Sequence, residues 1–184
     1  MPRFALLLTV LLSGCAIFSE PRPPLPDPGP VDLQRFMGDW YVIGFIPIGP
    51  ESDAHNGIET YALTPEGRIQ TTYRFREGGF DGELKTYTPN AKVVEGTGNA
   101  EWAMQFIWPL RSEYRIAYVD ADYQTTIIAR SKRDYVWLMA RQPDMDDATF
   151  SAFQQQIAAM GYAAEDFVRQ PQRWPEKEPR PPLD

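Results

Sequence analysis

Apolar and polar residues alternate in short segments through the middle of the chain. In residues 68–77, one face carries Ile69, Thr71, Tyr73 and Phe75, with polar side chains between them. A period of two is the pattern of a strand with one buried face, and turn residues separate successive segments. The pattern predicts strands at residues 39–47, 57–63, 68–77, 83–95, 101–108, 113–119, 124–130 and 134–141.

Eight consecutive strands with short connections predict an all-β fold, an eight-stranded up-and-down antiparallel barrel. Closing the sheet removes the exposed edges that an open sheet would have to protect. Pro89 has no backbone N–H, so it predicts a bulge or an edge position in the fourth strand.

The period changes to that of a helix after the last strand. Asp144 or Asp146 is available as the N-cap and Gly161 as the stop. We expect one C-terminal α-helix packed on the outside of the barrel, with a partner-binding helix as the alternative. The apolar positions at helical spacing are Phe150, Phe153, Ile157 and Met160.

Residues 1–14 have the design of a secretory signal peptide. Arg3 precedes an apolar run at residues 4–12, which is shorter than the roughly 20 helical residues needed to cross a bilayer. Leu12-Ser13-Gly14-Cys15 closely resembles the lipobox of bacterial lipoproteins. The resemblance implies acylation of Cys15, and Ala16 implies sorting to the outer membrane. The alternative is an ordinary signal peptide with a chance cysteine.

Proline-rich segments flank the predicted barrel. In residues 15–30, the proline-rich part predicts an extended polyproline II tether, which would act as a stiff spacer behind the lipidated cysteine. Residues 171–184 are also proline-rich and charged, and we expect them to be poorly ordered, with Trp174 as the residue able to dock. The folded domain is therefore expected to span residues 31–170.

Composition and charge exclude several function classes. The net charge of −7 argues against a nucleic-acid binder, which needs concentrated Lys and Arg. One cysteine and one histidine give neither a disulfide framework nor a metal cluster, and His55 is expected in solvent on a loop. No strand face clearly supplies the pair of carboxylates that acid–base chemistry would need. We therefore expect no enzyme activity, no cofactor and no metal.

Three ordered motifs resemble those of the lipocalins. Gly38-Asp39-Trp40-Tyr41 resembles the Gly-x-Trp motif that opens lipocalin barrels, and Asp120-Ala121-Asp122-Tyr123 resembles the second motif. Residues 133–141 resemble the third, which ends in an arginine. Over residues 31–170, the chain is most similar to the bacterial lipocalins, which are outer-membrane lipoproteins similar to apolipoprotein D.

The resemblance implies structural roles for the motif residues at one end of the barrel. Trp40 would plug that end, and Arg141 would lie across its indole ring in a cation–π contact. The turn at residues 120–123 would lie beside them. The residues assigned to barrel closure are Gly38, Trp40, Asp120, Asp122, Tyr123 and Arg141.

The opposite end of such a barrel leaves an interior able to hold one small ligand. Trp137 and Tyr135 are the strongest candidates to contact it, because the third motif places them in the upper half of the last strand. For every candidate, simple core filling is the alternative, and a one-residue slip would invert a face. The inward-facing candidates are Tyr61, Tyr73, Phe75, Trp102, Met104, Phe106, Tyr114, Tyr118, Tyr135, Trp137 and Met139.

The sequence thus predicts a lipocalin that binds, stores or transports a small hydrophobic ligand, such as a fatty acid or lysophospholipid. It would be lipid-anchored through Cys15 in the outer membrane and face the periplasm. The alternative is an envelope protein–protein interaction module that uses the barrel as a scaffold. The oligomeric state is left open, with a homodimer as one outcome.

Overall fold

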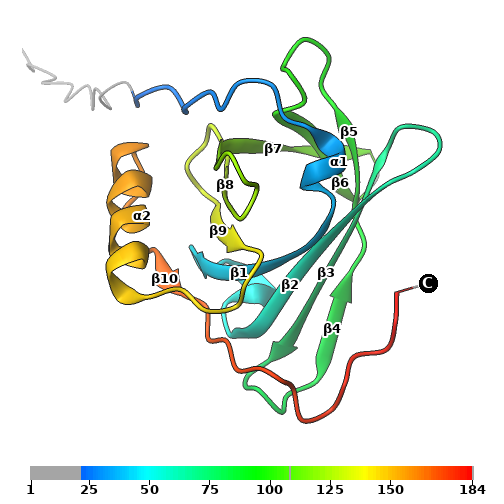
Figure 1. The fold of residues 1–184 in the computed structure, drawn as a ribbon, viewed down its shortest axis with the longest axis vertical. Helices are drawn as coiled ribbons and strands as arrows, with labels where there is room; N and C mark the ends of the chain where they lie inside the picture. The colour runs from blue at the N-terminus through cyan, green and yellow to red at the C-terminus, as the bar shows by residue number, and fades with distance from the viewer. Residues whose placement is uncertain (1–21, 108, 184) are drawn as a thin grey trace, which may run out of the picture.

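The computed structural model describes residues 22–107 and 109–183. The predicted signal peptide and Cys15 lie outside the described residues. A single antiparallel sheet closes on itself to form a barrel (Figure 1). Its strands are β1 (Gly38–Phe45), β2 (Ala54–Leu63), β3 (Ile69–Glu77), β4 (Leu84–Tyr87), β5 (Asn90–Val93), β6 (Glu101–Ile107), β7 (Leu110–Val119), β8 (Thr125–Ala129) and β9 (Val136–Ala140).

The barrel closes where β1 pairs with β9, with Phe45 opposite Trp137. β4 and β5 both pair with β3, so together they occupy one position in the barrel. The break between them falls at Pro89, which cannot donate to the ladder, although its carbonyl accepts a hydrogen bond from the Thr71 N–H at 3.1 Å. The predicted eight-stranded antiparallel barrel, with an interrupted fourth strand, is confirmed.

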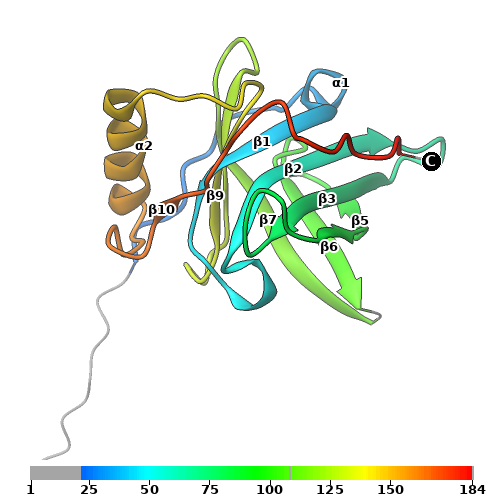
Figure 2. The same cartoon turned by 90° about the horizontal axis from the view of Figure 1, so that it is seen from below.

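Helix α2 (Asp147–Ala159) packs on the outside of the barrel, as predicted (Figures 1 and 2). Of the two candidate caps, Asp146 is the N-cap, and its carboxylate accepts from the Thr149 N–H at 2.9 Å. Gly161 follows the helix with φ = 91°, a conformation that glycine adopts without strain. Buried side chains of the helix, including Ile157, form a second apolar cluster with the outward face of the strands.

A short strand after α2, β10 (Val168–Arg169), adds to β1. It leads the chain back against Gly44, where a Cβ atom would lie 2.6 Å from Phe167 and 2.8 Å from Phe150. Only a residue without a side chain lets these two rings approach the backbone of β1 so closely.

The described part of the N-terminal tether, residues 22–30, lies against the barrel and does not extend away from it (Figure 1). Leu25 is 7% exposed and belongs to the second apolar cluster. Arg22 donates to the Lys132 carbonyl at 2.6 Å. The difference from the predicted free spacer arises because the prolines fix an extended backbone, while Leu25 supplies the apolar contact that holds it down.

The C-terminal segment also differs from its expectation of poor order, because residues 170–181 run across the outside of β1, β2 and β3 (Figure 2). The indole of Trp174 meets the Tyr41 ring edge-on at 5.3 Å. The Glu176 carboxylate lies between two guanidinium groups, 3.1 Å from Arg76 and 2.6 Å from Arg180. Burial alone would raise the pKa of Glu176, but the hydrogen bonds from these two arginines outweigh it and lower that pKa to about 2.

Two short helical turns mark the ends of the barrel. Helix α1 (Leu33–Phe36) lies at the end occupied by Trp40, and the 3₁₀ turn η1 (Gly49–Glu51) follows β1 at the opposite end. No helix in the described ranges is long and apolar enough to cross a membrane.

Candidate functional site: the barrel cavity

The end of the barrel at α1 is closed by Trp40 and Arg141. Trp40 is fully buried, and its indole N–H donates to the Phe36 carbonyl at 2.8 Å. The Arg141 guanidinium lies 3.8 Å above the Trp40 ring. It also donates to the carbonyl oxygens of Asp39 at 2.6 Å, Arg35 at 2.8 Å, Met37 at 2.9 Å, Phe36 at 3.1 Å and Tyr123 at 3.3 Å.

The predicted second motif forms the turn between β7 and β8 at this same end. The Asp120 carboxylate accepts from the backbone N–H groups of Asp122 at 2.9 Å and Thr125 at 2.5 Å. The Tyr123 hydroxyl accepts from the Asp32 N–H at 2.8 Å. Gly38 has φ = 91° beside Arg141. All six residues assigned to barrel closure therefore lie at the closed end, where Asp122 contributes its backbone.

A cavity of about 280 Å³ lies in the other half of the barrel. Its rim includes η1 and residues of the β6–β7 and β8–β9 hairpins, and we call this open end the mouth. Six of the predicted contact residues line the cavity: Tyr73, Met104, Phe106, Tyr114, Tyr135 and Trp137. Phe106 is 63% exposed, which places it at the rim.

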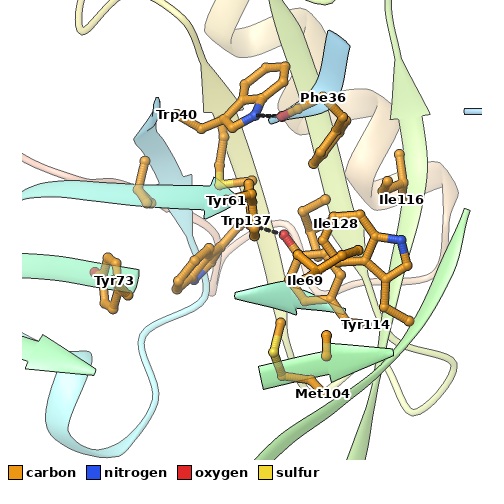
Figure 3. Packing of buried hydrophobic residues seen from close by; sticks show 14 of the residues in the cluster. Phe36, Trp40, Tyr61, Ile69, Tyr73, Met104, Tyr114, Ile116, Ile128 and Trp137 are labelled. Carbon is orange, nitrogen blue, oxygen red and sulfur yellow. Dashed lines mark hydrogen bonds between the residues drawn. The ribbon is translucent and has the colours of Figure 1, made fainter. Parts of the chain in front are cut away.

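Four further candidates lie inside the barrel but do not line the cavity. Tyr61, Phe75, Trp102 and Met139 are each at most 1% exposed and pack into the inner apolar cluster. Trp102 stacks on the cavity-lining Tyr114 ring at 5.1 Å. The Tyr61 and Tyr114 hydroxyls are hydrogen-bonded to each other (Figure 3). Their position matches the alternative of core filling.

Tyr118 is the one candidate that faces away from the barrel interior. Its ring lies 5.7 Å from Phe153 of α2 and belongs to the outer apolar cluster. The register of β7 on β8 shifts between Ile116 and Tyr118, which is a β-bulge. One extra residue at a bulge reverses the side-chain alternation, so the predicted inward orientation of Tyr118 is wrong.

Aromatic rings form one wall of the cavity. The Tyr73 and Trp137 rings are 4.7 Å apart, and the Tyr135 ring is 5.2 Å from Trp137. Figure 3 shows Tyr73 and Trp137 projecting from β3 and β9 towards each other. The indole N–H of Trp137 is buried, and none of the described residues accepts a hydrogen bond from it.

Two carboxyl groups that are not among the predicted contact residues also line the cavity. Glu59 of β2 is 3% exposed, and Glu51 comes from η1 at the mouth. Burial raises the pKa of Glu59 well above its usual range, the Tyr61 hydroxyl lowers it, and Glu51 raises it further. Burial raises the pKa of Glu51 to about 7. The prediction that no strand face supplies paired carboxylates missed this combination of a strand residue and a loop residue.

A sequence signal for Glu59 did exist. Glu59 is two residues before Tyr61 on the same strand, so any register that turns Tyr61 inward turns Glu59 inward as well. Glu51 belongs to the polar loop after β1, whose fold at the mouth depends on contacts distant in sequence.

The remaining polar groups of the cavity belong to its rim. Arg130 lies 3.5 Å from Asp134 in an ion pair. The Glu113 carboxylate accepts from the Ser131 N–H at 2.9 Å and from its hydroxyl at 2.6 Å. Arg130 and Glu113 thus each contact a residue of the β8–β9 turn, while the Nε of Arg130 is buried and none of the described residues accepts a hydrogen bond from it.

A closed antiparallel barrel with an outer helix, a sealed end and an internal cavity defines a lipocalin-type binding protein. The model of the lipocalin-like domain matches residues 31–172, and the chain belongs to this family. It is 27% identical over 150 residues to temperature-induced lipocalin-1 of Arabidopsis thaliana, covering 77% of this chain and 80% of that protein.

The chain is also similar to a bacterial member of the family. It is 23% identical over 151 residues to the outer membrane lipoprotein Blc of Escherichia coli strain K12, covering 77% of this chain and 83% of that one. Among solved structures, the cockroach allergen Per a 4 matches with a TM-score of 0.61 at 19% identity, covering 85% of this chain and 98% of that chain. The predicted resemblance to the bacterial lipocalins is confirmed.

Proposed function

We propose that this protein is a membrane-anchored lipocalin that holds a small amphiphile, of the fatty-acid or lysophospholipid kind, in the barrel cavity. The observation that carries the proposal is a cavity of about 280 Å³, walled by aromatic rings and located at the end opposite Arg141. Lipocalins bind small hydrophobic ligands in such a space. Each CH₂ group that leaves water contributes about 0.8 kcal/mol, so an alkyl chain supplies much of the affinity.

The position of the N-terminal segment supports an anchor close to the mouth. Arg22, the first described residue, contacts Lys132 in the β8–β9 turn, two residues from the cavity-lining Arg130. Cys15 precedes Arg22 by seven residues, a span of at most about 25 Å. An acylated Cys15 would therefore hold the mouth near the periplasmic surface of the membrane, and the name of Blc, an outer membrane lipoprotein, supports the outer membrane as that location.

No specific observation favours the interaction module. Trp174, the tail residue expected to be able to dock, packs on Tyr41 of its own barrel, and its indole N–H donates to Gln172 at 2.7 Å. Nor is the cavity filled by its own side chains, as it would be in a barrel that serves only as a scaffold.

The test is native mass spectrometry of the chain that begins at Ala16, purified without detergent from a bacterial host. We expect a carried-over or added amphiphile on the wild-type protein and on Tyr118→Ala, which removes an aromatic ring outside the barrel. Trp137→Asp should lose the ligand while keeping its β-sheet circular dichroism. A bare mass for the wild type after addition of amphiphiles would overturn the proposal. The same spectra separate monomer from homodimer.

The anchor is tested separately on the full chain. We expect an alkyne-labelled palmitate to be incorporated into the wild type and the protein to sediment with outer membranes. Cys15→Ser should lose both the label and the membrane association. Equal labelling of the two chains would refute acylation at Cys15.

A further inference from the structure

The cavity contains carboxyl oxygens that the protein itself leaves without hydrogen-bond donors. Oε2 of Glu59 and Oε2 of Glu51 are both buried, and no donor from residues 22–107 or 109–183 reaches either atom. Glu59 is 97% buried, since 3% of it is exposed, and it lines the cavity. Buried polar atoms are normally satisfied, so an unpartnered carboxyl facing a cavity indicates a group that the ligand would complete.

The aromatic wall complements these carboxyls. Tyr73, Trp137 and Tyr135 surround the same space, with neighbouring ring centroids 4.7 and 5.2 Å apart. The faces of aromatic rings attract a cation, and cages of such rings recognise ammonium groups. The carboxyls and the ring faces of this cavity therefore both favour a positively charged ligand.

The cavity offers fewer partners to an anionic head group than to a cationic one. Arg130 is the one cation among the described lining residues, and it is paired with Asp134 at 3.5 Å. The titratable groups around Glu51 are the acids Glu59 and Glu113, the tyrosines at positions 73, 87, 114 and 135, and Arg130. Acidic groups thus outnumber the single arginine, although the Nε of Arg130 is itself buried and receives no acceptor from the described residues.

We propose that the cavity is selective for a hydrophobic amine, whose ammonium group donates to the Glu51 and Glu59 carboxyls against the faces of Tyr73, Tyr135 and Trp137. This inference rests on the proposed ligand-binding function and changes its ligand class, because it favours a cationic amphiphile over a fatty acid. An oxygen acceptor next to the amine would also satisfy the indole N–H of Trp137.

The proposal fixes the sign of the pH dependence. An ammonium ligand binds best when Glu51 is ionised, and the pKa of that carboxyl is raised to about 7. The affinity for an amine should therefore rise from pH 6 to pH 8. A fatty acid requires the opposite state, because an ionised Glu51 repels its carboxylate, so its affinity should fall over the same interval.

The experiment compares three probes of equal chain length: nonylamine, nonanol and nonanoic acid. Each is titrated by calorimetry into the chain that begins at Ala16, which retains every contact described for residues 22–183. At pH 8 we expect nonylamine to bind at least about tenfold more tightly than nonanoic acid, which is the size of one charge-assisted hydrogen bond. Nonanol should lie between the two.

Three variants assign the preference to the carboxyls. Glu51→Gln and Glu59→Gln keep the side-chain shape and should each weaken nonylamine binding by about tenfold, while changing nonanol binding less than threefold. Glu95→Gln makes the same charge change on an exposed residue at the closed end and should change neither. If a Gln variant fails to fold, the pH dependence of nonylamine binding to the wild-type protein still tests whether a carboxyl causes the preference.

The outcomes separate this inference from the proposed function. Tighter binding of nonanoic acid, or nonylamine binding that is indifferent to both Gln substitutions and to pH, overturns the amine selectivity and leaves the ligand-binding function standing. No binding of any of the three probes overturns both.

Discussion

Replacement of Arg141 tests whether the closed end holds the barrel together. Its guanidinium makes five hydrogen bonds to backbone carbonyls of three segments and a cation–π contact with Trp40. Charge-assisted bonds contribute about 1.5–3 kcal/mol each in isolation, but bonds of one half-buried group are not additive. We therefore expect Arg141→Met, which keeps the apolar stem, to lower the free energy of unfolding by about 3–4 kcal/mol.

Urea unfolding followed by tryptophan fluorescence measures this loss. With a slope of about 2 kcal/mol per molar urea, the midpoint should fall by roughly 1.5–2 M. Arg141→Lys keeps the charge but loses the planar guanidinium, so its urea midpoint should fall about half as far as that of Arg141→Met. A midpoint shift below about 0.5 M in the Met variant would refute the reasoning. Nonanol affinity should be unchanged in the folded Met variant, because the cavity lies at the other end.

Three further substitutions test the packed segments. Glu176→Gln should lower the free energy of unfolding by about 2 kcal/mol at pH 7, because it removes the charge between two arginines. Urea titrations should show this difference between the variant and the wild type shrinking as the pH falls from about 4.5 to 2, where the wild-type carboxylate becomes protonated. Gly44→Ala should cost about 1–3 kcal/mol, seen as a lower thermal midpoint, because its Cβ would lie 2.6 Å from Phe167. Leu25→Ala should lower the free energy of unfolding by about 2 kcal/mol, seen as a lower urea midpoint, because it removes the apolar side chain that packs the N-terminal segment on the second apolar cluster.

The strands were predictable because the barrel has one buried face repeated along every strand. The interruption at Pro89 was also predictable, since it depends on a missing N–H and not on any distant contact. The bulge that turns Tyr118 towards α2 was not, because the residues on either side of it still alternate in the sequence. Register irregularities depend on the partner strand, which a period of two does not contain.

The positions of the two terminal segments could not be predicted from the sequence, for a different reason. Proline-rich composition correctly indicates extended backbone, but it does not determine whether that backbone leaves the domain or lies on it. Glu176 is held by Arg76, which precedes it by 100 residues and faces outward from β3. In a barrel taken alone, Arg76 would be an ordinary surface arginine, so the sequence pattern gives no reason to pair it with the tail.

There is a physical reason why the pattern of apolar residues does not predict the acidic groups of the cavity. A carboxyl among core residues lowers stability unless it is paired. The apolar pattern of the strand therefore predicts that Tyr61 faces inward, but it does not predict the same of Glu59, two residues earlier. The residues most informative about the ligand are therefore those that fit the barrel interior least well. The same argument explains why Tyr73 and Trp137 could be predicted, since they serve the core and the cavity at once.

The misfit of Glu59 leads to a prediction about the empty protein. If the Glu59 carboxyl serves ligand binding and does not stabilise the fold, then Glu59→Met, which fills similar space without a polar group, should raise the free energy of unfolding by about 1–2 kcal/mol. The same change should abolish the preference for nonylamine over nonanol. Nonylamine should in turn stabilise the wild-type protein in thermal unfolding, because it binds only the folded state. A destabilised Glu59→Met variant would contradict this, since it would mean that the carboxyl already contributes to the fold, and the unpartnered oxygen would then belong to the core and not to the binding site.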